Sequence, residues 1–392
     1  MKRSVWIITT SRADYGLLIN LMKELKEDER CSLKIIATGM HASKMHGETY
    51  KMIIEDGFEI YKLVDIELND DSAASIVRSI GIGCIKFADI FNDERPDIAV
   101  VLGDRFDLLP VLISCLVNNI IVAHIHGGEI SEGAIDESIR HSISKMSQYH
   151  FPAAEEYKDR LIQMGEDPEK IFNFGAPGLD SLYKISFMSR KEFVKKIGLK
   201  EDEKIALVTF HPATTEDISP DKEASNVTQA ILETGIQAIF TSSNADKYGS
   251  IINKKFREFC ESYPAKFKFF ENLGNEMYYN ALKYCDVMIG NSSSGLTEAP
   301  SFKLPVINIG SRQKGRIKAK NIIDADTDKE SIKKSLYYSI SNQFKNLIAD
   351  VENPYDKLKN GMTSISIKEK LLELSISGSV LKKKFYKLNS IA

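Results

Sequence analysis

Short apolar runs rich in β-branched residues alternate with amphipathic helical patterns along most of this 392-residue chain, and that alternation limits the possible folds more than any other feature. The run at residues 5–10, for example, is followed by a turn and then by an amphipathic pattern that continues to about Glu29. Strands that are joined by helices form parallel sheets with right-handed crossovers. The chain is therefore expected to have an α/β fold.

The alternation occurs in two series of similar length. A glycine- and proline-rich turn at residues 175–178 and a charged stretch at residues 190–204 interrupt the pattern between them. We expect two Rossmann-like, doubly wound domains, residues 1–185 and residues 186–375. Two such domains in tandem leave a central cleft, and clefts at domain interfaces are preferred ligand sites.

The end of the chain carries one more helical pattern and a basic segment. The helical pattern, at about residues 364–375, follows an Asn-Pro break, and we assign it to the second domain. The alternative is that it returns to pack on the first domain. Residues 376–392 are expected to form a basic tail, and the part after Leu381, which begins with three consecutive lysines, is expected to be frayed.

Composition and charge argue against several classes of protein. The net charge of -3 disfavours a general nucleic-acid binder, whose surface would be basic. No apolar run approaches the roughly 18 residues that a membrane helix needs, and the first ten residues carry no secretory signal. The five cysteines are scattered without a CxxC motif, which indicates reduced thiols. We expect a cytoplasmic protein without a membrane partner.

Three carboxylates within residues 98–145 are the leading candidates for chemistry. Asp104 and Glu129 follow two apolar, strand-like runs, and Asp136 begins the next helix, with Arg140 one turn further on the same face. Ligands of open α/β sheets bind at the carboxyl ends of the strands. Carboxylates that share a pocket raise one another's pKa, which suits one of them to act as an acid and another as a base.

The loop at residues 290–295 in the second domain, Gly-Asn-Ser-Ser-Ser-Gly, is a candidate phosphate site. It follows a strand and precedes a helix, so small residues, hydroxyl groups and a helix N-terminus would meet an anion there. Asn291, Ser292 and Ser293 belong to this loop, and Glu298, one helical turn beyond it, is placed to accept hydrogen bonds from a ribose. The alternative is an ordinary N-capped helix start.

Other polar residues follow strands in both domains. His211 ends the first strand of the second domain, where a histidine could donate to a phosphate, and Arg312 and Arg316 lie in a basic loop that contains glycine. Arg12 and Asp14 follow the first strand of the first domain. The alternative for each is a locally bonded or solvated side chain.

Motifs for common cofactors are missing from the sequence. It contains no GxxxxGK[ST] motif and no GxGxxG motif after a strand, which argues against an ATP-hydrolysing P-loop and a dinucleotide site. His124 and His126 lie two residues apart on one strand, but no third ligand follows at a convincing spacing. We therefore expect no metal.

Eight motifs, in order along nearly the whole chain, resemble those of the hydrolysing UDP-N-acetylglucosamine 2-epimerases of sialic acid biosynthesis. These motifs are Ser11-Arg12-Ala13-Asp14-Tyr15-Gly16, Thr38-Gly39-Met40-His41, Gly103-Asp104-Arg105, His126-Gly127-Gly128-Glu129, Asp136-Glu137-Ser138-Ile139-Arg140-His141, Phe210-His211-Pro212, Gly290-Asn291-Ser292-Ser293 and Arg312-Gln313. Any one of them is weak evidence, whereas eight in the same order are specific.

The resemblance implies a fold and a reaction. The fold is a two-domain arrangement like that of the B-type glycosyltransferases (GT-B-like), with the active site in the interdomain cleft and no metal or redox cofactor. In the reaction, anti elimination of UDP with loss of the C2 proton gives a 2-acetamidoglucal, and syn addition of water then gives N-acetylmannosamine. Departure of UDP puts catalytic weight on the groups that hold the pyrophosphate and on placed carboxylates. The family also implies a homodimer or a homotetramer.

Individual residues receive roles from the same resemblance. Asp104, Glu129 and Asp136 form the acid and base set, and which of them takes the first proton stays open. His211 and the serines of the loop would meet the phosphates together with Arg316, and Glu298 would meet the ribose. The residues implied around the UDP-sugar are Arg12, Asp14, Arg140, His211, Asn244, Asp246, Asn291, Ser292, Ser293, Glu298, Arg312 and Arg316.

The substrate has a first interpretation and several alternatives. UDP-N-acetylglucosamine comes first. The loop at residues 131–135 resembles at least as well the branch that hydrolyses UDP-2,4-diacetamido-2,4,6-trideoxyglucose (UDP-N,N'-diacetylbacillosamine) on the way to legionaminic acid. The further alternatives are a non-hydrolysing UDP-N-acetylglucosamine 2-epimerase, a GT-B glycosyltransferase and a catalytically silent sensor of nucleotide sugars.

Overall fold

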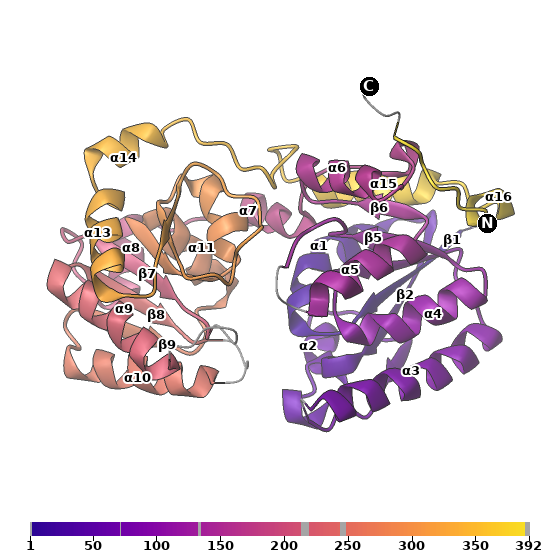
Figure 1. The fold of residues 1–392 in the computed structure, drawn as a ribbon, viewed down its shortest axis with the longest axis horizontal. Helices are drawn as coiled ribbons and strands as arrows, with labels where there is room; N and C mark the ends of the chain where they lie inside the picture. Colours follow the sequence, from indigo (N-terminus) through magenta and orange to yellow (C-terminus); the bar gives the residue numbers. More distant parts are fainter. Residues whose placement is uncertain (1, 71, 132–134, 213–218, 244–247, 389–392) are drawn as a thin grey trace. The chain divides into compact units, whose positions relative to one another are not determined.

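The computed structural model describes residues 2–70, 72–131, 135–212, 219–243 and 248–388. The chain divides into two compact units: unit 1 comprises Met1–Tyr183 and Tyr355–Ala392, and unit 2 comprises Lys184–Pro354. Each unit contains a six-stranded sheet, and every strand pair in both sheets is parallel. Helices flank both sheets (Figure 1). Each unit is thus an α/β layer structure of the expected class.

The sheet of unit 1 has the strand order β3-β2-β1-β4-β5-β6. Its strands are β1 (Arg3–Thr9), β2 (Cys31–Thr38), β3 (Lys62–Val64), β4 (Ile98–Leu102), β5 (Ile121–Ile125) and β6 (Tyr149–Phe151). Along β1, Val5 and Ile7 enter one hydrophobic cluster, whereas Trp6 and Ile8 enter another. Side chains of a strand alternate between the faces, so helices cover this sheet on both sides and its central strands are apolar throughout.

The helices of unit 1 cover both faces of the sheet (Figure 1), and those before β6 connect successive strands. They are α1 (Arg12–Glu27), α2 (Tyr50–Glu55), α3 (Ala73–Asp93), α4 (Leu109–Val117), α5 (Ile135–Met146), α6 (Glu155–Gln163), α7 (Asp180–Lys184), α15 (Thr363–Glu373) and α16 (Gly378–Leu381). Local sequence sets their ends. The hydroxyl of Ser72 caps α3 by accepting a hydrogen bond from the amide of Ser75 at 3.2 Å.

Unit 2 repeats the same plan with the strand order β12-β11-β10-β7-β8-β9. Its strands are β7 (Ile205–Thr209), β8 (Gln237–Thr241), β9 (Phe267–Phe270), β10 (Val287–Gly290), β11 (Val306–Ile309) and β12 (Ile322–Ala325). Its helices are α8 (Arg190–Ile197), α9 (Pro220–Thr234), α10 (Gly249–Ser262), α11 (Gly274–Tyr284), α12 (Ser294–Thr297), α13 (Lys329–Ser339) and α14 (Asn342–Leu347). Pro220 at the first position of α9 and Gly235 just after its end follow the usual rules for helix termini.

The C-terminal segment belongs to unit 1. The helix predicted at about residues 364–375 thus packs on the first domain, as the alternative held, and the range of residues 186–375 for the second domain was too long. Ile367 and Leu371 of α15 are fully buried in a hydrophobic cluster that also contains Leu18 and Leu21 of α1. The chain returns because the apolar stripe of α15 needs a partner, and α1 supplies one. In Figure 1, α15 and α16 lie in yellow beside β6.

Residues 382–388 contact the rest of unit 1, so the expectation of a frayed end after Leu381 was wrong for the described part of that segment. The aromatic ring of Phe385 lies against Gly165, where an added Cβ would come within 2.4 Å of the ring. The amide of Tyr386 donates to the carbonyl of Gly165 at 2.8 Å. A run of three lysines suggests a solvated end, but the aromatic residues that follow it dock the chain.

Two edge segments show how weak the local pattern is there. The apolar residues 171–174, whose sequence is strand-like, contribute a single bridge between Ile171 and His150. Conversely β12 was not expected, since its sequence offers only two β-branched residues before Asp324 and Ala325. Both segments lie at a sheet edge, where few backbone pairs are available and the sequence pattern is short.

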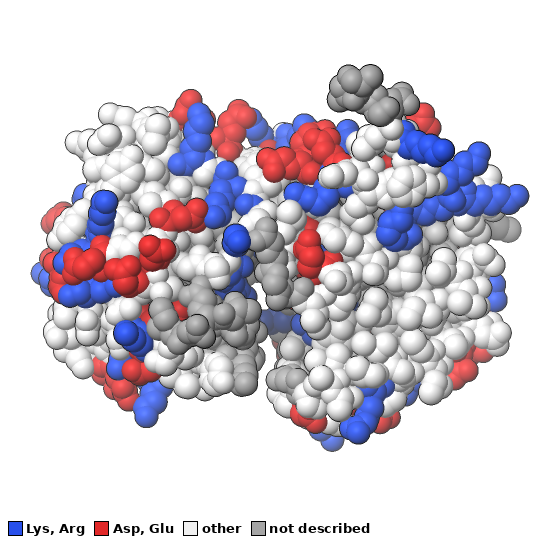
Figure 2. Space-filling view, viewed as in Figure 1, with Lys and Arg blue, Asp and Glu red and all other residues white. Residues whose placement is uncertain are grey.

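Charge is dispersed over each unit. Figure 2 shows lysine and arginine interspersed with aspartate and glutamate on the visible face of both units, in keeping with the small net charge. Among the helices within the described ranges, none combines the length and the apolar character that a membrane crossing requires.

Substitution Leu371→Ala tests the docking of α15. Because Leu371 is fully buried against unit 1, we expect the substitution to lower the free energy of unfolding of unit 1 by about 2–5 kcal/mol. Trp6, the only tryptophan of the chain, is buried in unit 1, so its fluorescence in a urea titration reports on this unit. Leu388→Ala is the matched control because Leu388 is 56% exposed. Equal stability of the two variants would contradict the role of α15.

Candidate active site

The predicted acids of unit 1 lie at one edge of its sheet. Strands β1, β2, β4 and β5 are parallel, so the loops that follow them leave the sheet at the same edge. Asp104 follows β4, and Glu129 follows β5. Asp136 lies in the first turn of α5 and is partly exposed. The topology therefore brings the three predicted acids to neighbouring connections.

Asp14 is bonded to the loop in which it lies. Its carboxylate accepts hydrogen bonds from the Thr9 hydroxyl at 2.6 Å, from the Thr10 amide at 2.9 Å and from the amide and hydroxyl of Ser11 at 2.7 and 2.6 Å. This network fixes the turn between β1 and α1. Arg12, the first residue of α1, is exposed. The geometry gives Asp14 a structural task in addition to the binding role predicted for it.

Asp104 forms an ion pair with Arg140 of α5. Arg140 is 2% exposed, and its Nη2 also donates to the Ser131 hydroxyl at 3.0 Å. Next to this pair, Glu137 accepts a hydrogen bond from the Ser131 amide at 2.6 Å and lies 3.0 Å from Nε2 of His141. The loop after β4, the loop after β5 and the start of α5 are thereby joined. The described structure places Arg140 with Asp104, rather than on a solvated helix face.

Glu129 and His126 form a close dyad after β5. Nδ1 of His126 lies 2.6 Å from Oε1 of Glu129, and both side chains are about nine-tenths buried. His126 has a left-handed backbone with φ of 63°, which is uncommon for a non-glycine residue. Position 128 requires glycine, because an added Cβ would lie 2.3 Å from the carbonyl oxygen of Tyr157. The dyad lies in the turn that follows β5, and Nε2 of His126 has no partner among the described residues.

Arg105 and Asp107 lie in the loop after β4 beside Asp104, and the predicted site residues do not include them. Asp107 is fully buried, and burial raises the pKa of its carboxyl group. Arg105 bonds Asp107 at 3.1 Å, and the charge of Asp107 raises the pKa of Arg105, with smaller contributions from Asp14 and Asp136. Gly39 leaves room for this carboxylate because a Cβ there would come within 2.3 Å of it. The motif Gly103-Asp104-Arg105 was the available signal for Arg105, whereas Asp107 resembles an ordinary helix-start acid.

His124 is held inside the unit by two local hydrogen bonds. Its Nε2 lies 2.8 Å from the carbonyl oxygen of Gly103, and its Nδ1 lies 3.1 Å from the hydroxyl of Ser144. Burial lowers the pKa of His124 to about 3, so the imidazole is neutral. His124 and His126 therefore contact different partners, which agrees with the interpretation of strand-end histidines that are bonded locally.

In unit 2, the predicted phosphate loop follows β10 and is joined to β7. The amide of His211 donates to the side-chain oxygen of Asn291 at 2.7 Å, and the side-chain nitrogen of Asn291 donates to the carbonyl of His211 at 2.8 Å. Gly290 has φ of 139°, and an added Cβ would lie 1.9 Å from the carbonyl oxygen of Thr209. Only glycine allows the backbones to approach so closely. His211 and the loop are thus one assembled unit.

His211 is buried and neutral. Burial, and to a smaller extent the charge of Arg312, lowers its pKa to about 3. Its Nδ1 lies 3.2 Å from the hydroxyl of Ser243. Arg312 and Gln313 both donate to the carbonyl of Asn291, at 3.2 and 2.8 Å. The residues after β7, β8, β10 and β11 therefore converge on one loop.

The serines of the loop lead into the short helix α12. Ser292 is partly exposed and Ser293 is exposed, so their hydroxyl groups are accessible. The hydroxyl oxygens of Tyr278 and Ser294 are hydrogen-bonded at 2.6 Å. Partial burial raises the pKa of Glu298, while the hydroxyls of Ser294 and Thr297 oppose that rise. Tyr278 is a further residue that the sequence did not single out.

For three of the predicted binding residues, the structure gives no side-chain contact that bears on their role. Arg316 is partly exposed in the loop after β11, where its backbone amide donates to the carbonyl of Gln313 at 3.3 Å. Asn244 and Asp246 lie outside the described residues. Their predicted roles stay predictions.

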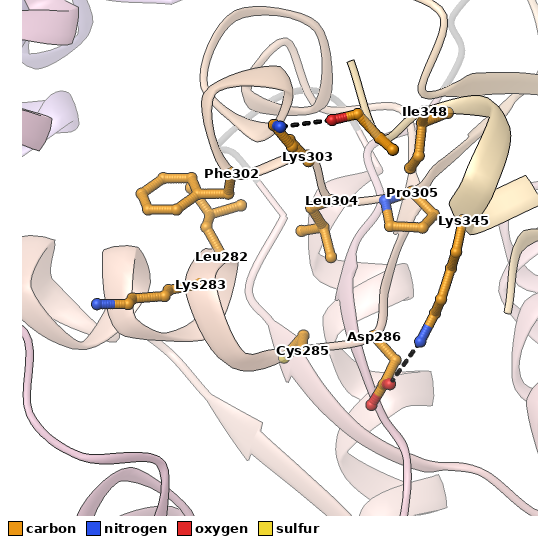
Figure 3. A pocket seen from close by; sticks show the side chains of 11 residues that line it. Leu282, Lys283, Cys285, Asp286, Phe302, Lys303, Leu304, Pro305, Lys345 and Ile348 are labelled. Atoms are coloured by element: carbon orange, nitrogen blue, oxygen red, sulfur yellow. Dashed lines mark hydrogen bonds and ion pairs between the residues drawn. The ribbon is translucent and has the colours of Figure 1, made fainter. Parts of the chain in front are cut away.

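A pocket of unit 2 lies at the opposite edge of the sheet. It measures about 270 Å³ and is lined by Cys285 and Asp286 before β10 and by Leu304 and Pro305 before β11 (Figure 3). Its charged groups are engaged locally, as in the contact of 3.5 Å between Lys345 and Asp286. Because ligands of open α/β sheets bind at the carboxyl ends of the strands, this pocket is not the candidate site.

Sequence comparisons identify relatives over most of the chain. The family described as UDP-N-acetylglucosamine 2-epimerase matches residues 23–372. A Campylobacter jejuni protein named GDP/UDP-N,N'-diacetylbacillosamine 2-epimerase (hydrolyzing) is 42% identical over 83% of this chain and 85% of its own length. The Legionella pneumophila UDP-N,N'-diacetylbacillosamine 2-epimerase (hydrolyzing) is 39% identical over 85% and 87%. The Escherichia coli polysialic acid biosynthesis protein P7 is 37% identical over 91% and 90%.

Solved structures with the same fold are more distant in sequence. A UDP-GlcNAc 2-epimerase from Neisseria meningitidis, bound to UDP-GlcNAc, has a TM-score of 0.79 with 18% identity and covers 95% of this chain and 100% of its own. The Methanocaldococcus jannaschii UDP-GlcNAc 2-epimerase in complex with UDP-GlcNAc and UDP has a TM-score of 0.72 with 20% identity and covers 94% and 99%. The two parallel sheets and these neighbours confirm the predicted α/β, two-domain, GT-B-like fold.

Substitution Gly290→Ala tests the contact between the loop and β7. The new methyl group would collide with the carbonyl of Thr209 in a backbone conformation that suits only glycine, so we expect a loss of more than about 3 kcal/mol of stability in unit 2. Thermal unfolding followed by circular dichroism measures it. Gly235→Ala is the matched control, since Gly235 has φ of 74° but open space around it, and it should cost on the order of 1 kcal/mol. An equal effect of both substitutions would contradict the close approach.

Proposed function

The chain belongs to the UDP-N-acetylglucosamine 2-epimerase family, and we propose that it hydrolyses UDP-N,N'-diacetylbacillosamine with inversion at C2 of the sugar. The observation that carries the choice of sugar is the name of the two relatives at 42% and 39% identity. UDP-N-acetylglucosamine, the first interpretation of the sequence, becomes the second candidate. The 37% identical polysialic acid biosynthesis protein P7 favours that candidate.

Unit 2 would hold the nucleotide. Backbone amides and hydroxyls at the start of α12, together with His211, offer hydrogen-bond donors to a pyrophosphate. The neutral His211 is suited to donate one hydrogen bond without a change of protonation near pH 7. Holding the pyrophosphate stabilises UDP as a leaving group when its bond to C1 breaks. Glu298 would accept hydrogen bonds from the ribose hydroxyls.

Unit 1 would supply the proton transfers. In the elimination, the C1–O bond to UDP breaks and a base takes the C2 proton, which leaves a double bond between C1 and C2. In the hydration, water adds its hydroxyl to C1 and an acid returns a proton to C2 from the opposite face. Asp104, Glu129 and Asp136 are the proposed acid and base set. Each half reaction needs one group of each kind.

The contacts of the acids suggest different roles for Asp104 and Glu129. The ion pair with Arg140 holds the side chain of Asp104 in one place, which suits Asp104 to act as a fixed polar group beside C1. Glu129 shares a short hydrogen bond with His126, and that dyad can pass a proton between its members. We therefore place the dyad among the proton-transferring groups. A homodimer or homotetramer without a metal or redox cofactor completes the proposal.

A side-by-side assay of nucleotide sugars tests the function. We expect the protein to release free UDP and a free 2,4-diacetamido-2,4,6-trideoxymannose from UDP-N,N'-diacetylbacillosamine, with a kcat/KM at least about tenfold above that for UDP-N-acetylglucosamine. The GDP-linked sugar is the third substrate. In deuterium oxide the product should carry one deuterium at C2. A product still linked to UDP would show a non-hydrolysing epimerase, and a higher kcat/KM on UDP-N-acetylglucosamine would reverse the order of the two candidates.

Conservative substitutions test the acid and base set. Asp104→Asn, Glu129→Gln and Asp136→Asn should each lower kcat by about 10²- to 10⁴-fold, because general acid and base groups contribute that much. The dissociation constant of UDP, measured by calorimetry, should stay close to that of the unchanged protein, since unit 2 is proposed to bind it. Glu156→Gln, at an exposed position of α6, is the control. Full turnover in all three variants would leave a nucleotide-sugar sensor as the remaining explanation.

A further inference from the structure

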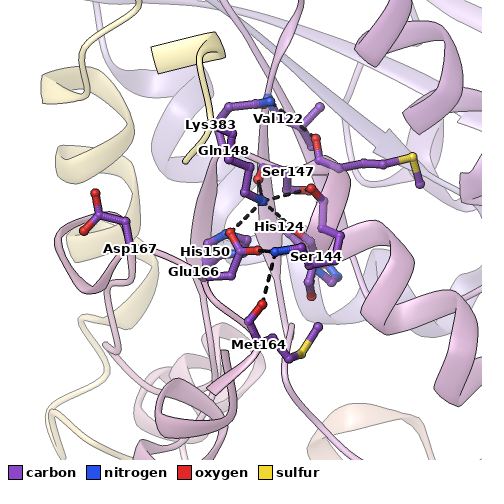
Figure 4. Close-up of polar contacts among 12 residues, drawn as sticks. Val122, His124, Ser144, Ser147, Gln148, His150, Met164, Glu166, Asp167 and Lys383 are labelled. Carbon is purple, nitrogen blue, oxygen red and sulfur yellow. Dashed lines mark hydrogen bonds and ion pairs between the residues drawn. The ribbon is translucent and has the colours of Figure 1, made fainter. Parts of the chain in front are cut away.

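A lysine of the C-terminal segment reaches the end of helix α5. Lys383 lies between exposed neighbours, yet its own side chain is only 22% exposed. Figure 4 shows its side chain beside Ser144, Ser147, Glu166 and His150. All of these residues belong to unit 1. The site lies away from the predicted acids, at the other end of the helix that carries Asp136.

The ammonium group of Lys383 completes the hydrogen bonds at the carboxyl end of α5. It donates to the carbonyl oxygens of Ser144, Lys145 and Ser147 at 3.1, 2.9 and 2.6 Å. The last carbonyls of a helix have no partner within the helix, and a cation there also interacts favourably with the helix dipole. The carbonyl of Ile143 is bonded by Ser147 at 2.8 Å. The amide of Ser147 also donates to the carbonyl of Ser144, at 3.2 Å, so Lys383 adds to the local bonds of the helix end and joins three of its carbonyls through one ammonium group.

A buried carboxylate fixes Lys383 in this place. Glu166 is 1% exposed, and its oxygens contact Lys383 at 2.6 Å, Lys145 at 2.7 Å and His150 at 3.0 Å. Burial by itself would raise the pKa of Glu166, but these three bonds more than offset it and lower the pKa to about 2. Burial lowers the pKa of His150, so a neutral imidazole shares the hydrogen bond. The carboxylate thus stays charged and attracts both lysines.

The end of α5 is connected to the predicted acids by two routes. One route is the helix itself, which carries Asp136 two to three turns and Arg140 one to two turns before the carbonyls that Lys383 binds. The other runs through the Ser144 hydroxyl to His124, and from His124 to the carbonyl of Gly103, the residue before Asp104. A helix is stiff along its axis, so a shift at one end moves the side chains at the other.

We propose that Lys383 is a positioning residue for the epimerase: by binding the carbonyl end of α5 and Glu166, it sets the place of the helix that presents Asp136 and Arg140 to the sugar. The inference rests on the proposed function for its catalytic part. Its structural part, that Lys383 holds α5, stands on the contacts alone. A lysine that merely stabilised the fold would leave turnover unchanged in every variant that folds.

Substitution Lys383→Met tests the proposal, because it keeps a similar shape and removes the charge and the donors. Lys384→Met is the matched control, since it removes the same charge at the next, exposed position. Two measurements are made on the full-length protein: kcat and KM on the better of the two UDP-sugars, and amide hydrogen exchange of peptides that cover Ile135–Met146. Lys383→Arg, which keeps a cation and several donors, is the conservative variant.

We expect Lys383→Met to lower kcat by about tenfold or more with KM within about twofold, since a displacement near 1 Å costs on the order of a hundredfold in rate. Exchange along α5 should become faster. Lys384→Met should change neither quantity, and Lys383→Arg should recover most of the lost kcat. Should Lys383→Met fail to fold, Lys383→Gln replaces it, since glutamine also lacks the charge but is polar. Fast exchange of the α5 amides with full turnover in that variant would overturn the proposal.

Two results would overturn the inference, and a third concerns only the proposed function. Unchanged exchange of α5 in Lys383→Met would show that the lysine does not hold the helix. Faster exchange with an unchanged kcat would show that its hold has no bearing on the reaction. If the unchanged protein hydrolyses neither UDP-sugar, the proposed function fails, while the exchange measurement still decides whether Lys383 holds α5.

Discussion

The buried guanidinium of Arg140 is the constraint on which the acid site of unit 1 depends. A charge that is removed from water destabilises the fold unless it is paired and hydrogen-bonded. Arg140 is 2% exposed, and Asp104 and Ser131 are its partners from two different loops. The loops after β4 and β5 must therefore keep their positions relative to α5. A pair of this kind adds little net stability, but breaking it is costly, and so it specifies one arrangement of the site.

The two units carry different polar groups at the carboxyl ends of their strands. Parallel strands direct their loops to one edge, so a sequence of this fold can place polar groups there without disturbing the core. In unit 1 these groups are carboxylates with arginine and histidine partners. In unit 2 they are hydroxyls, amides and a neutral histidine around a glycine that lets two backbones meet. Elimination from C1 and C2 of a UDP-sugar needs both kinds of environment, one for proton transfer and one for the leaving group.

The sequence predicted the parts of the fold that follow from local pattern. The apolar runs of β4, β5 and β7 and the loop after β10 could be recognised because each strand is buried along its whole length and ends at a glycine or a polar residue. The return of α15 to unit 1 could not be fixed in this way, since its apolar stripe matches the surface of either domain. Only the contact of Ile367 and Leu371 with α1 decides it.

Long-range partners were the least predictable part of the site. The Asp136 helix suggested an arginine on the same face, but Asp104 as the partner of Arg140 lies 36 positions away along the chain. Lys383 stands in a run of three lysines that resembles a solvated end, and its bonds to Ser144 and Glu166 span more than two hundred positions. A local sequence pattern does not predict ion pairs between residues far apart in the chain, because the charge of one residue does not determine which of many opposite charges it will contact.

Selection between the two candidate sugars cannot reside in the acids themselves. Both sugars have the same groups at C1 and C2, so Asp104, Glu129 and Asp136 would meet identical atoms in either. The sugars differ at C4, by an acetamido group against a hydroxyl, and at C6, by a methyl group against a hydroxymethyl. An apolar surface rejects an added hydroxyl only weakly, whereas a site built to hydrogen-bond a polar group rejects strongly the analogue that lacks it. The residues that contact the C4 substituent should therefore decide the substrate. The segment between Glu129 and Asp136 joins two of the acids along the chain, so it is the first place to look for those residues.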